Sequence, residues 1–308
     1  MLAVFTFDSV SQLTVVAIRN GAFYGLLGVG FAIILGVTGR FHYAYGFTYA
    51  LAAYMVFTFI DRAGLSLWPS AVLGIGLVTA FGIGIERFIY RPLAARAGAN
   101  ALLAVFVASL GLGIAGENII RLLWSSAAQQ LRGVTIKPYH LGPTNFLNLD
   151  VYQVITSTVL VILLTVALRY TRLGRAVKAT RSNTDMARII GINPNTIYLL
   201  VFGVGTFFCG VAAFWRGMEF NVQPDMGFQP VVIAFVVAFL AGTASSPVRV
   251  FITGILVSMV EQYSSIWLSA RWTQLAIFVV LVLYLVSLSF DPRAVLARLW
   301  PGARTAGV

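Results

Sequence analysis

The chain has 308 residues, of which 59% are hydrophobic and only 10% are charged. Soluble domains carry about 25% charged residues, so this composition excludes an ordinary soluble protein and predicts an integral membrane protein. The net charge of +11 does not indicate a nucleic-acid partner, because the cations gather in short segments between apolar runs.

Apolar runs long enough to cross the roughly 30 Å hydrocarbon core of a bilayer recur along the chain. We predict long spans at residues 15–36, 43–61, 68–88, 100–124, 151–170, 195–218 and 272–290. Two shorter runs, 228–243 and 248–264, flank a break at Gly242–Pro247. We interpret this break either as a turn between two short helices near the cytosolic face or as the middle of one discontinuous helix.

These spans predict an all-α integral membrane protein with about nine transmembrane helices. We expect a single transmembrane domain, residues 1–308, with an outer loop at 125–150 and a cytosolic loop at 171–194. An outside N-terminus and an inside C-terminus place about twice as many Lys and Arg residues inside as outside, in agreement with the positive-inside rule.

The cytosolic segment 171–194 carries the clearest local signals. Its second half reads as a short helix, with N-cap candidates at Ser182, Asn183 and Thr184 and with Gly191 at the left-handed position after the helix. Pro194 then blocks further continuation. The charge alone fits a topology anchor, whereas a capped helix with an apolar face fits a docking element for a cytosolic partner.

We assign the docking role to residues of this segment that are charged or lie at helical spacing. They are Arg175, Lys178, Asp185, Met186, Arg188, Ile189, Ile190 and Gly191.

Signatures of catalysis are absent from the sequence. It has two histidines, no H-E-x-x-H pair and no G-x-S-x-G elbow, so we assign no catalytic and no metal-binding residues. It also lacks a G-x-x-x-x-G-K-[ST] phosphate loop. We therefore expect a transport subunit rather than an enzyme, with no cofactor of its own, and any ATP and Mg²⁺ would bind to a partner chain.

Polar residues inside the spans are the candidates for a translocation path, because burying such groups in a membrane is costly. They are Asn20, His42, Tyr45, Glu117, Asn118 and Glu261. Each also has a purely structural interpretation. Asn20 would hydrogen-bond a neighbouring helix, His42 would pack among aromatic rings, and the glutamates would pair with outer arginines, namely Arg121, Arg216 and Arg271. A further acid, Glu86, lies beside Arg87 and is interpreted either as a structural pair with it or as a topology element.

The order of several motifs resembles a known family. A glycine-rich first span, Gly21–Gly36, leads into a V-x-G-x-F-x-x-A-x-G turn, and E-R-x-x-x-R-P-L follows at Glu86–Leu93. Segment 171–194 contains L-G-R-A and A-R-x-x-G-I. These features resemble the permease subunits of bacterial branched-chain amino-acid type ABC importers, over roughly residues 15–290.

The resemblance implies a type II importer-like arrangement in the bacterial cytoplasmic (inner) membrane. It implies a second permease subunit, expected to be a paralogue, two cytosolic ATPase subunits and a soluble solute-binding protein outside. The solute would be a small polar or amphipathic compound, such as a branched-chain amino acid. The chain departs from the usual family pattern at His42–Gly46 and Ala241–Ser246, so a different compound stays open.

An ion-coupled secondary transporter is the alternative. Such carriers usually place ionisable residues at the membrane midplane, whereas the acids here lie off-centre.

Overall fold

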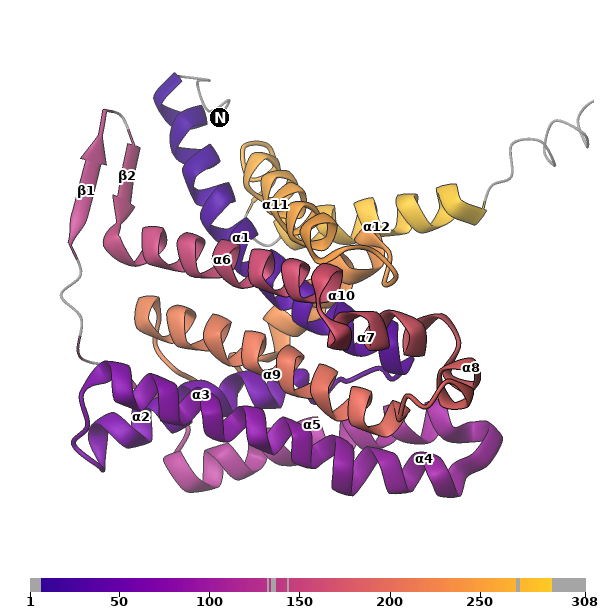
Figure 1. Ribbon diagram of the computed structural model, residues 1–308. Coiled ribbons are helices and arrows are strands. Elements are labelled where there is room, and N and C mark those ends of the chain that lie inside the picture. Colours follow the sequence, from indigo (N-terminus) through magenta and orange to yellow (C-terminus); the bar gives the residue numbers. More distant parts are fainter. Residues whose placement is uncertain (1–6, 132, 134–136, 143, 270–271, 290–308) are drawn as a thin grey trace, which may run out of the picture.

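The computed structural model describes residues 7–131, 133, 137–142, 144–269 and 272–289. Most of the chain is helical (Figure 1). The α-helices are α1 (Phe7–Thr38), α2 (Tyr45–Asp61), α3 (Leu67–Gly84), α4 (Arg91–Ala97), α5 (Ala101–Trp124), α6 (Asn148–Tyr170), α7 (Arg172–Ser182), α8 (Thr184–Ile189), α9 (Pro194–Glu219), α10 (Phe228–Ala241), α11 (Pro247–Ser264) and α12 (Thr273–Ser289).

The predicted spans match α1, α2, α3, α5, α6, α9, α10, α11 and α12. Four helical stretches of the described residues are long and apolar enough to cross a membrane by length and composition: Asp8–Thr38, Leu67–Trp124, Asn148–Tyr170 and Pro194–Glu219. The break at Gly242–Pro247 is the predicted turn, because α10 ends at Ala241 and α11 begins at Pro247.

Helix α1 forms the axis of the bundle and contacts α6, α9, α10 and α11. In an 18-residue apolar window of α1, 83% of the residues are buried, compared with 11% in the corresponding window of the stretch Leu67–Trp124. Small residues make this central position possible. A Cβ added at Gly21 would lie 2.5 Å from Cα of Ile255, and one added at Gly25 would lie 2.6 Å from the Phe251 ring. Helices α1 and α11 therefore approach each other at backbone distance.

The third span extends further than predicted. After α3 the chain makes a π-helical turn at Ile85–Tyr90 and continues as α4 to Ala97, and a 3₁₀ turn at Gly98–Asn100 precedes α5. The helical structure therefore continues beyond residue 88, which was predicted to be the inner end of this span.

The segment 125–150, expected to be a loop, contains a β-hairpin that the sequence analysis did not predict. Strand β1 (Pro138–Leu141) pairs antiparallel with β2 (Thr144–Leu147). Gln12 of α1 anchors the hairpin, because its side-chain amide bonds both the backbone oxygen (3.0 Å) and the backbone nitrogen (2.7 Å) of Asn145. Figure 1 shows the hairpin at one end of the bundle and α8 at the other end. This arrangement agrees with the expectation that the two segments lie on opposite sides of a membrane.

Candidate functional site

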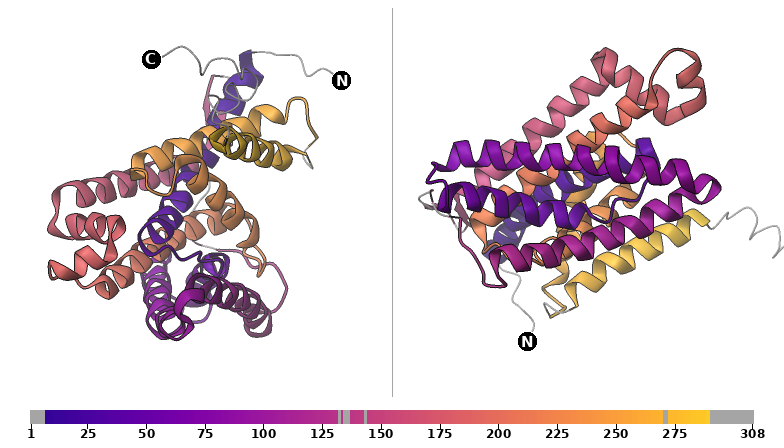
Figure 2. Two further views of the ribbon diagram at one scale, coloured as in Figure 1. Left: turned by 90° about the vertical axis from the view of Figure 1, so that its right-hand side faces the viewer. Right: turned by 90° about the horizontal axis from the view of Figure 1, so that it is seen from below.

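Two consecutive helices form the segment 171–194 and lie at an edge of the bundle (Figure 2). The Thr171 hydroxyl caps α7 by accepting a hydrogen bond from the backbone nitrogen of Gly174 at 3.0 Å. Asn183 then caps α8, since its Oδ1 accepts from the backbone nitrogens of Asp185 and Met186, each at 3.0 Å. Asn183 is thus the N-cap among the predicted candidates.

The end of α8 also follows the sequence signals. Gly191 has a φ of +84°, a left-handed conformation that glycine adopts without strain. The backbone nitrogen of Ile192 donates to the oxygen of Ala187 at 2.9 Å, which closes the helix end. Pro194 does more than stop this helix, because it occupies the first turn of α9.

One face of α8 is apolar and exposed. Met186, Ile189 and Ile190 are 61%, 78% and 70% exposed, while Ala187 on the opposite side is buried. Asp185 and Arg188 form an exposed ion pair of 3.1 Å on the same helix. The short helix therefore presents three large hydrophobic side chains that nothing in this chain covers among the described residues.

The remaining residues assigned to docking lie on or near α7. Arg175 is exposed, and Lys178 is exposed at the rim of a cavity between helices. The structure therefore gathers the assigned residues into one segment but divides them between two helices.

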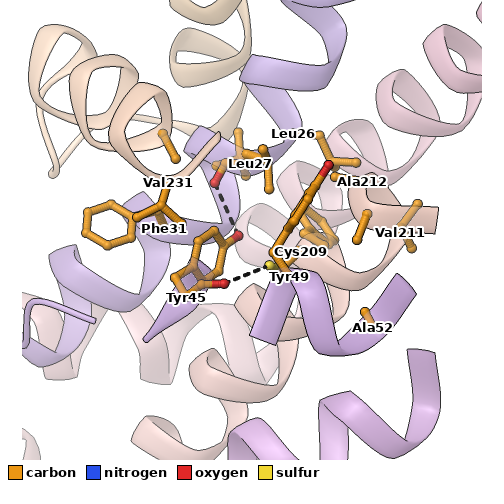
Figure 3. Packing of buried hydrophobic residues seen from close by; sticks show 14 of the residues in the cluster. Leu26, Leu27, Phe31, Tyr45, Tyr49, Ala52, Cys209, Val211, Ala212 and Val231 are labelled. Atoms are coloured by element: carbon orange, nitrogen blue, oxygen red, sulfur yellow. Dashed lines mark hydrogen bonds between the residues drawn. The ribbon is translucent and has the colours of Figure 1, made fainter. Parts of the chain in front are cut away.

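Two of the path candidates lie in the packed core. His42 and Tyr45 are 0% exposed. The Nδ1 atom of His42 lies 2.8 Å from the Tyr90 hydroxyl. The Tyr45 hydroxyl donates to the backbone oxygens of Leu27 (3.3 Å) and Gly205 (3.2 Å), as Figure 3 shows for Leu27. In this conformation both side chains join helices of one subunit, and a role in the path stays a proposal.

Two further candidates belong to a polar cluster that links α1, α6, α9 and α11. Asn20 Oδ1 accepts from Arg19 Nε at 3.3 Å. Glu261 accepts from the Tyr24 hydroxyl at 2.8 Å, and among the described residues it forms no ion pair. Arg271, one of its suggested partners, lies outside the described residues. The Tyr24 partner on α1 was not foreseen.

Arg19 is the centre of the ion pairs in this cluster. Its Nη1 lies 2.8 Å from Oε1 of Glu219 and 3.4 Å from Oδ1 of Asp150, and Arg216 pairs with Glu219 at 3.2 Å. Neither Asp150 nor Glu219 was a candidate, because each lies at the end of a predicted span, where a single charge does not interrupt the apolar run. The chain has only 10 acidic residues. Because a charge within a membrane span is costly, each acid near a span is expected to have a partner, and this is the one sequence signal for these two residues.

The last two candidates lie on α5, where Glu117 is half-buried and Asn118 is exposed. Glu117 pairs with Arg121 at 2.5 Å, which confirms its structural interpretation, and the Asn118 amide donates to the backbone oxygen of Ile114 at 2.8 Å. Glu117 also lines a small cavity of about 60 Å³ together with Tyr43. Among the path candidates, Glu117 therefore combines charge, partial exposure and a cavity.

The suggested pairing of Glu86 with Arg87 is wrong. Glu86 forms a buried ion pair with Arg40, whose guanidinium also lies 5.2 Å from the ring centre of Tyr198 on α9. Consecutive residues on a helix point in different directions, so Arg87 cannot face Glu86 and is exposed.

Within the residues that the structure describes, no group of three or more His, Cys, Asp or Glu side chains is arranged to hold a metal ion. The described residues form a helical bundle with a few polar groups between its helices. At one end of the bundle lies a capped helix with an exposed apolar face.

Comparison with known proteins gives a consistent result. The model of the family described as branched-chain amino acid transport system / permease component matches residues 13–286. The high-affinity branched-chain amino acid transport system permease protein BraD of Pseudomonas aeruginosa is 28% identical over 301 residues, covering 93% of this chain and 95% of the relative. The corresponding protein LivH of Escherichia coli is 27% identical over 292 residues, covering 90% and 92%.

A solved chain of PsaBC from Streptococcus pneumoniae in complex with Fab shares the fold. Its TM-score is 0.50 at 14% sequence identity, and the match covers 96% of both chains. Since the family model spans most of the sequence, this chain belongs to the family of permease components of branched-chain amino acid transport systems.

Proposed function

We propose that this chain is one of two permease subunits of an ATP-driven importer, and that segment 171–194 couples it to separate ATPase subunits. The observation that carries this proposal is the exposed apolar face of α8, formed by Met186, Ile189 and Ile190. A capped helix of this kind between two membrane spans needs a protein groove to cover it.

The size of the uncovered face supports a stable contact. Burying a Leu, Ile or Met side chain is worth about 1.5–3 kcal/mol, so covering these three partly exposed side chains contributes roughly 3–6 kcal/mol. The surrounding cations, such as Arg175 and Arg188, favour a groove with an acidic rim.

The solute is a branched-chain amino acid or a related small polar or amphipathic compound. The names of the BraD and LivH relatives support this class. The chain itself has few ionisable groups in its spans, which suits a path that passes a solute without binding it tightly. ATP and Mg²⁺ would bind to the ATPase subunits, a paralogous second permease would complete the path, and a binding protein would deliver the solute.

The coupling role is tested with the double variant Ile189→Asp/Ile190→Asp in the assembled complex. Two carboxylates on the apolar face should abolish ATPase binding and solute-stimulated ATP hydrolysis while the permease stays in the membrane. Tyr139→Asp, on the exposed hairpin at the other end of the bundle, is the matched control and should retain coupling. Unchanged assembly and stimulation in the double variant would contradict the docking role.

The energy source is tested separately by uptake of labelled leucine, isoleucine and valine into membrane vesicles. ATP should drive uptake whether or not a protonophore has collapsed the ion gradients. Uptake that needs a proton or sodium gradient and no ATP would instead support the ion-coupled alternative.

A further inference from the structure

A cavity of about 690 Å³ lies where α1, α6 and α7 meet the turn between α10 and α11. Its deep wall is apolar, with Val29, Ala32 and Ile33 of α1 facing Val250 of α11. None of the six path candidates lines this cavity. The candidate translocation path therefore does not account for this cavity.

Three cations stand at the rim of the cavity: Arg169 of α6 and Lys178 and Arg181 of α7. No acidic side chain lines it, and in the part of the chain that the structure describes none of the three cations forms an ion pair. Partial burial lowers the pKa of the Arg181 guanidinium. An anion between these groups would relieve both their mutual repulsion and their loss of hydration.

The opposite side of the rim is also suited to an anion. Ser245 and Ser246 of the turn line the cavity, and α11 begins next to them at Pro247. The positive end of the α11 dipole therefore lies at the same opening. Ser245 donates its hydroxyl proton to the backbone oxygen of Ala241, whereas among the described residues Ser246 only accepts from the backbone nitrogen of Arg249. The Ser246 hydroxyl on one side and the cations on the other can therefore both donate to a phosphate group.

The position of the opening decides between a lipid and a soluble anion. Arg169 is the second-last residue of the 23-residue helix α6, so the rim lies at the end of a membrane span. On either side, α6 exposes Val166 and α11 exposes Ile252, both of which would face lipid. A soluble anion would bind the cations but would not fill the apolar part of the cavity. A phospholipid would do both, because its phosphate can lie between the cations while an acyl chain lies along the apolar wall.

We propose that this cavity binds an anionic phospholipid of the cytoplasmic leaflet. Arg169, Lys178 and Arg181 hold the phosphate, and an acyl chain lies along the apolar wall of α1. The choice of leaflet rests on the proposed function, because α7 is cytosolic only in that orientation. Such a lipid would link the ATPase-docking segment to the turn between α10 and α11.

The test is native mass spectrometry of the purified complex, with its ATPase subunits, titrated with phosphatidylglycerol or phosphatidylcholine. Each cation near a lipid surface improves affinity roughly fivefold, so Arg169→Gln/Lys178→Gln/Arg181→Gln should weaken phosphatidylglycerol binding by about 100-fold. Phosphatidylcholine should bind weakly to both proteins. The matched control neutralises three exposed cations that neither line the cavity nor belong to the residues assigned to docking: Arg87, Arg96 and Arg172.

Equal losses in the two triple variants would overturn the proposal, since bulk charge would then explain the binding. Displacement of the lipid by millimolar inorganic phosphate would also overturn it, in favour of a soluble anion. Lipid that binds the permease pair but leaves when the ATPases assemble would assign the cavity to the ATPase contact instead.

A second variant tests the apolar part of the site. Ala244 is an exposed residue of the turn that lines the cavity, so Ala244→Trp should obstruct the opening without disturbing the core. It should reduce phosphatidylglycerol binding while all three cations remain, and unchanged binding would contradict the proposal. Lipid binding is measured without solute or ATP, so its failure leaves the transport function untouched.

Discussion

Removing one partner of the Arg40–Glu86 ion pair should destabilise the permease strongly, whereas replacing both partners should not. The Glu86 side chain is 1% exposed and that of Arg40 is 10% exposed, so each charge depends on the other for compensation. Breaking a buried pair from one side costs about 3–5 kcal/mol, but replacing both charges with apolar groups of similar volume is often neutral or stabilising.

The experiment compares Glu86→Gln, Arg40→Met and the double variant Arg40→Met/Glu86→Leu. Arg40→Met should cost slightly more than Glu86→Gln, because it also removes the cation–π contact with Tyr198, worth about 0.5–2 kcal/mol. Domains of 150–250 residues lose about 2–4 °C in Tm for each kcal/mol, so each single variant should unfold on the order of 10 °C earlier.

Thermal unfolding of the purified protein in one detergent measures these shifts. The double variant should unfold close to the wild type. Arg87→Gln, which changes the exposed neighbour, is the control and should shift Tm by no more than about 2 °C. If the losses of the two single variants simply add in the double variant, the two charges do not interact and the reasoning is refuted.

Three other predictions concern local features. Asn183→Ala should increase hydrogen exchange in α8, because losing an N-cap costs about 1 kcal/mol, whereas Asn183→Asp should preserve protection. Gly21→Ala should lower Tm through a steric conflict of about 1–3 kcal/mol with α11, while Gly76→Ala, which meets nothing within 4 Å, should not; equal shifts would contradict the packing argument. In a cysteine-free background, an impermeant thiol reagent should label Tyr139→Cys but not Ile190→Cys in intact cells, and the reverse pattern would overturn the predicted orientation.

The membrane spans could be predicted because the bilayer sets their length and removes most alternatives. Apolar runs of about 20 residues have one structural solution in hydrocarbon, the helix, so composition alone locates them. Local backbone signals were equally informative. Gly191 and Asn183 mark the two ends of α8 through φ preference and side-chain hydrogen bonding, which depend only on neighbouring residues.

In α7 the many cations indicate a topology anchor more clearly than the spacing of the buried residues indicates a helix. Its cations suggested a topology anchor, so the segment 172–182 was not predicted to be helical. Yet its buried positions, Gly174, Val177 and Thr180, recur every three residues, and Thr171 provides an N-cap. This pattern was readable from the sequence, and it also places Lys178 and Arg181 at the rim of the large cavity.

The partners of the buried charges could not be predicted. Arg40 and Glu86 lie 46 positions apart, and Arg19 and Asp150 lie 131 positions apart. Which charge faces which depends on the rotation and depth of packed helices, and that depends on many weak contacts at once. For the same reason the sequence did not show that Tyr45 points into the core, where its hydroxyl bonds two helix backbones.

These partners also limit which parts of the bundle can move during transport. Arg19, in the first half of α1, ties it to α6 and α9, and Arg40, just beyond the end of α1, is tied to Glu86 and lies against Tyr198. Between them, glycines hold α1 against α11 at backbone distance. From Arg19 to its C-terminal end, α1 is tied by ion pairs and packed through glycines, so this part acts as a rigid axis. The conformational change that opens a path is therefore expected at the periphery, on helices such as α5, where the half-buried Glu117 lies beside a small cavity.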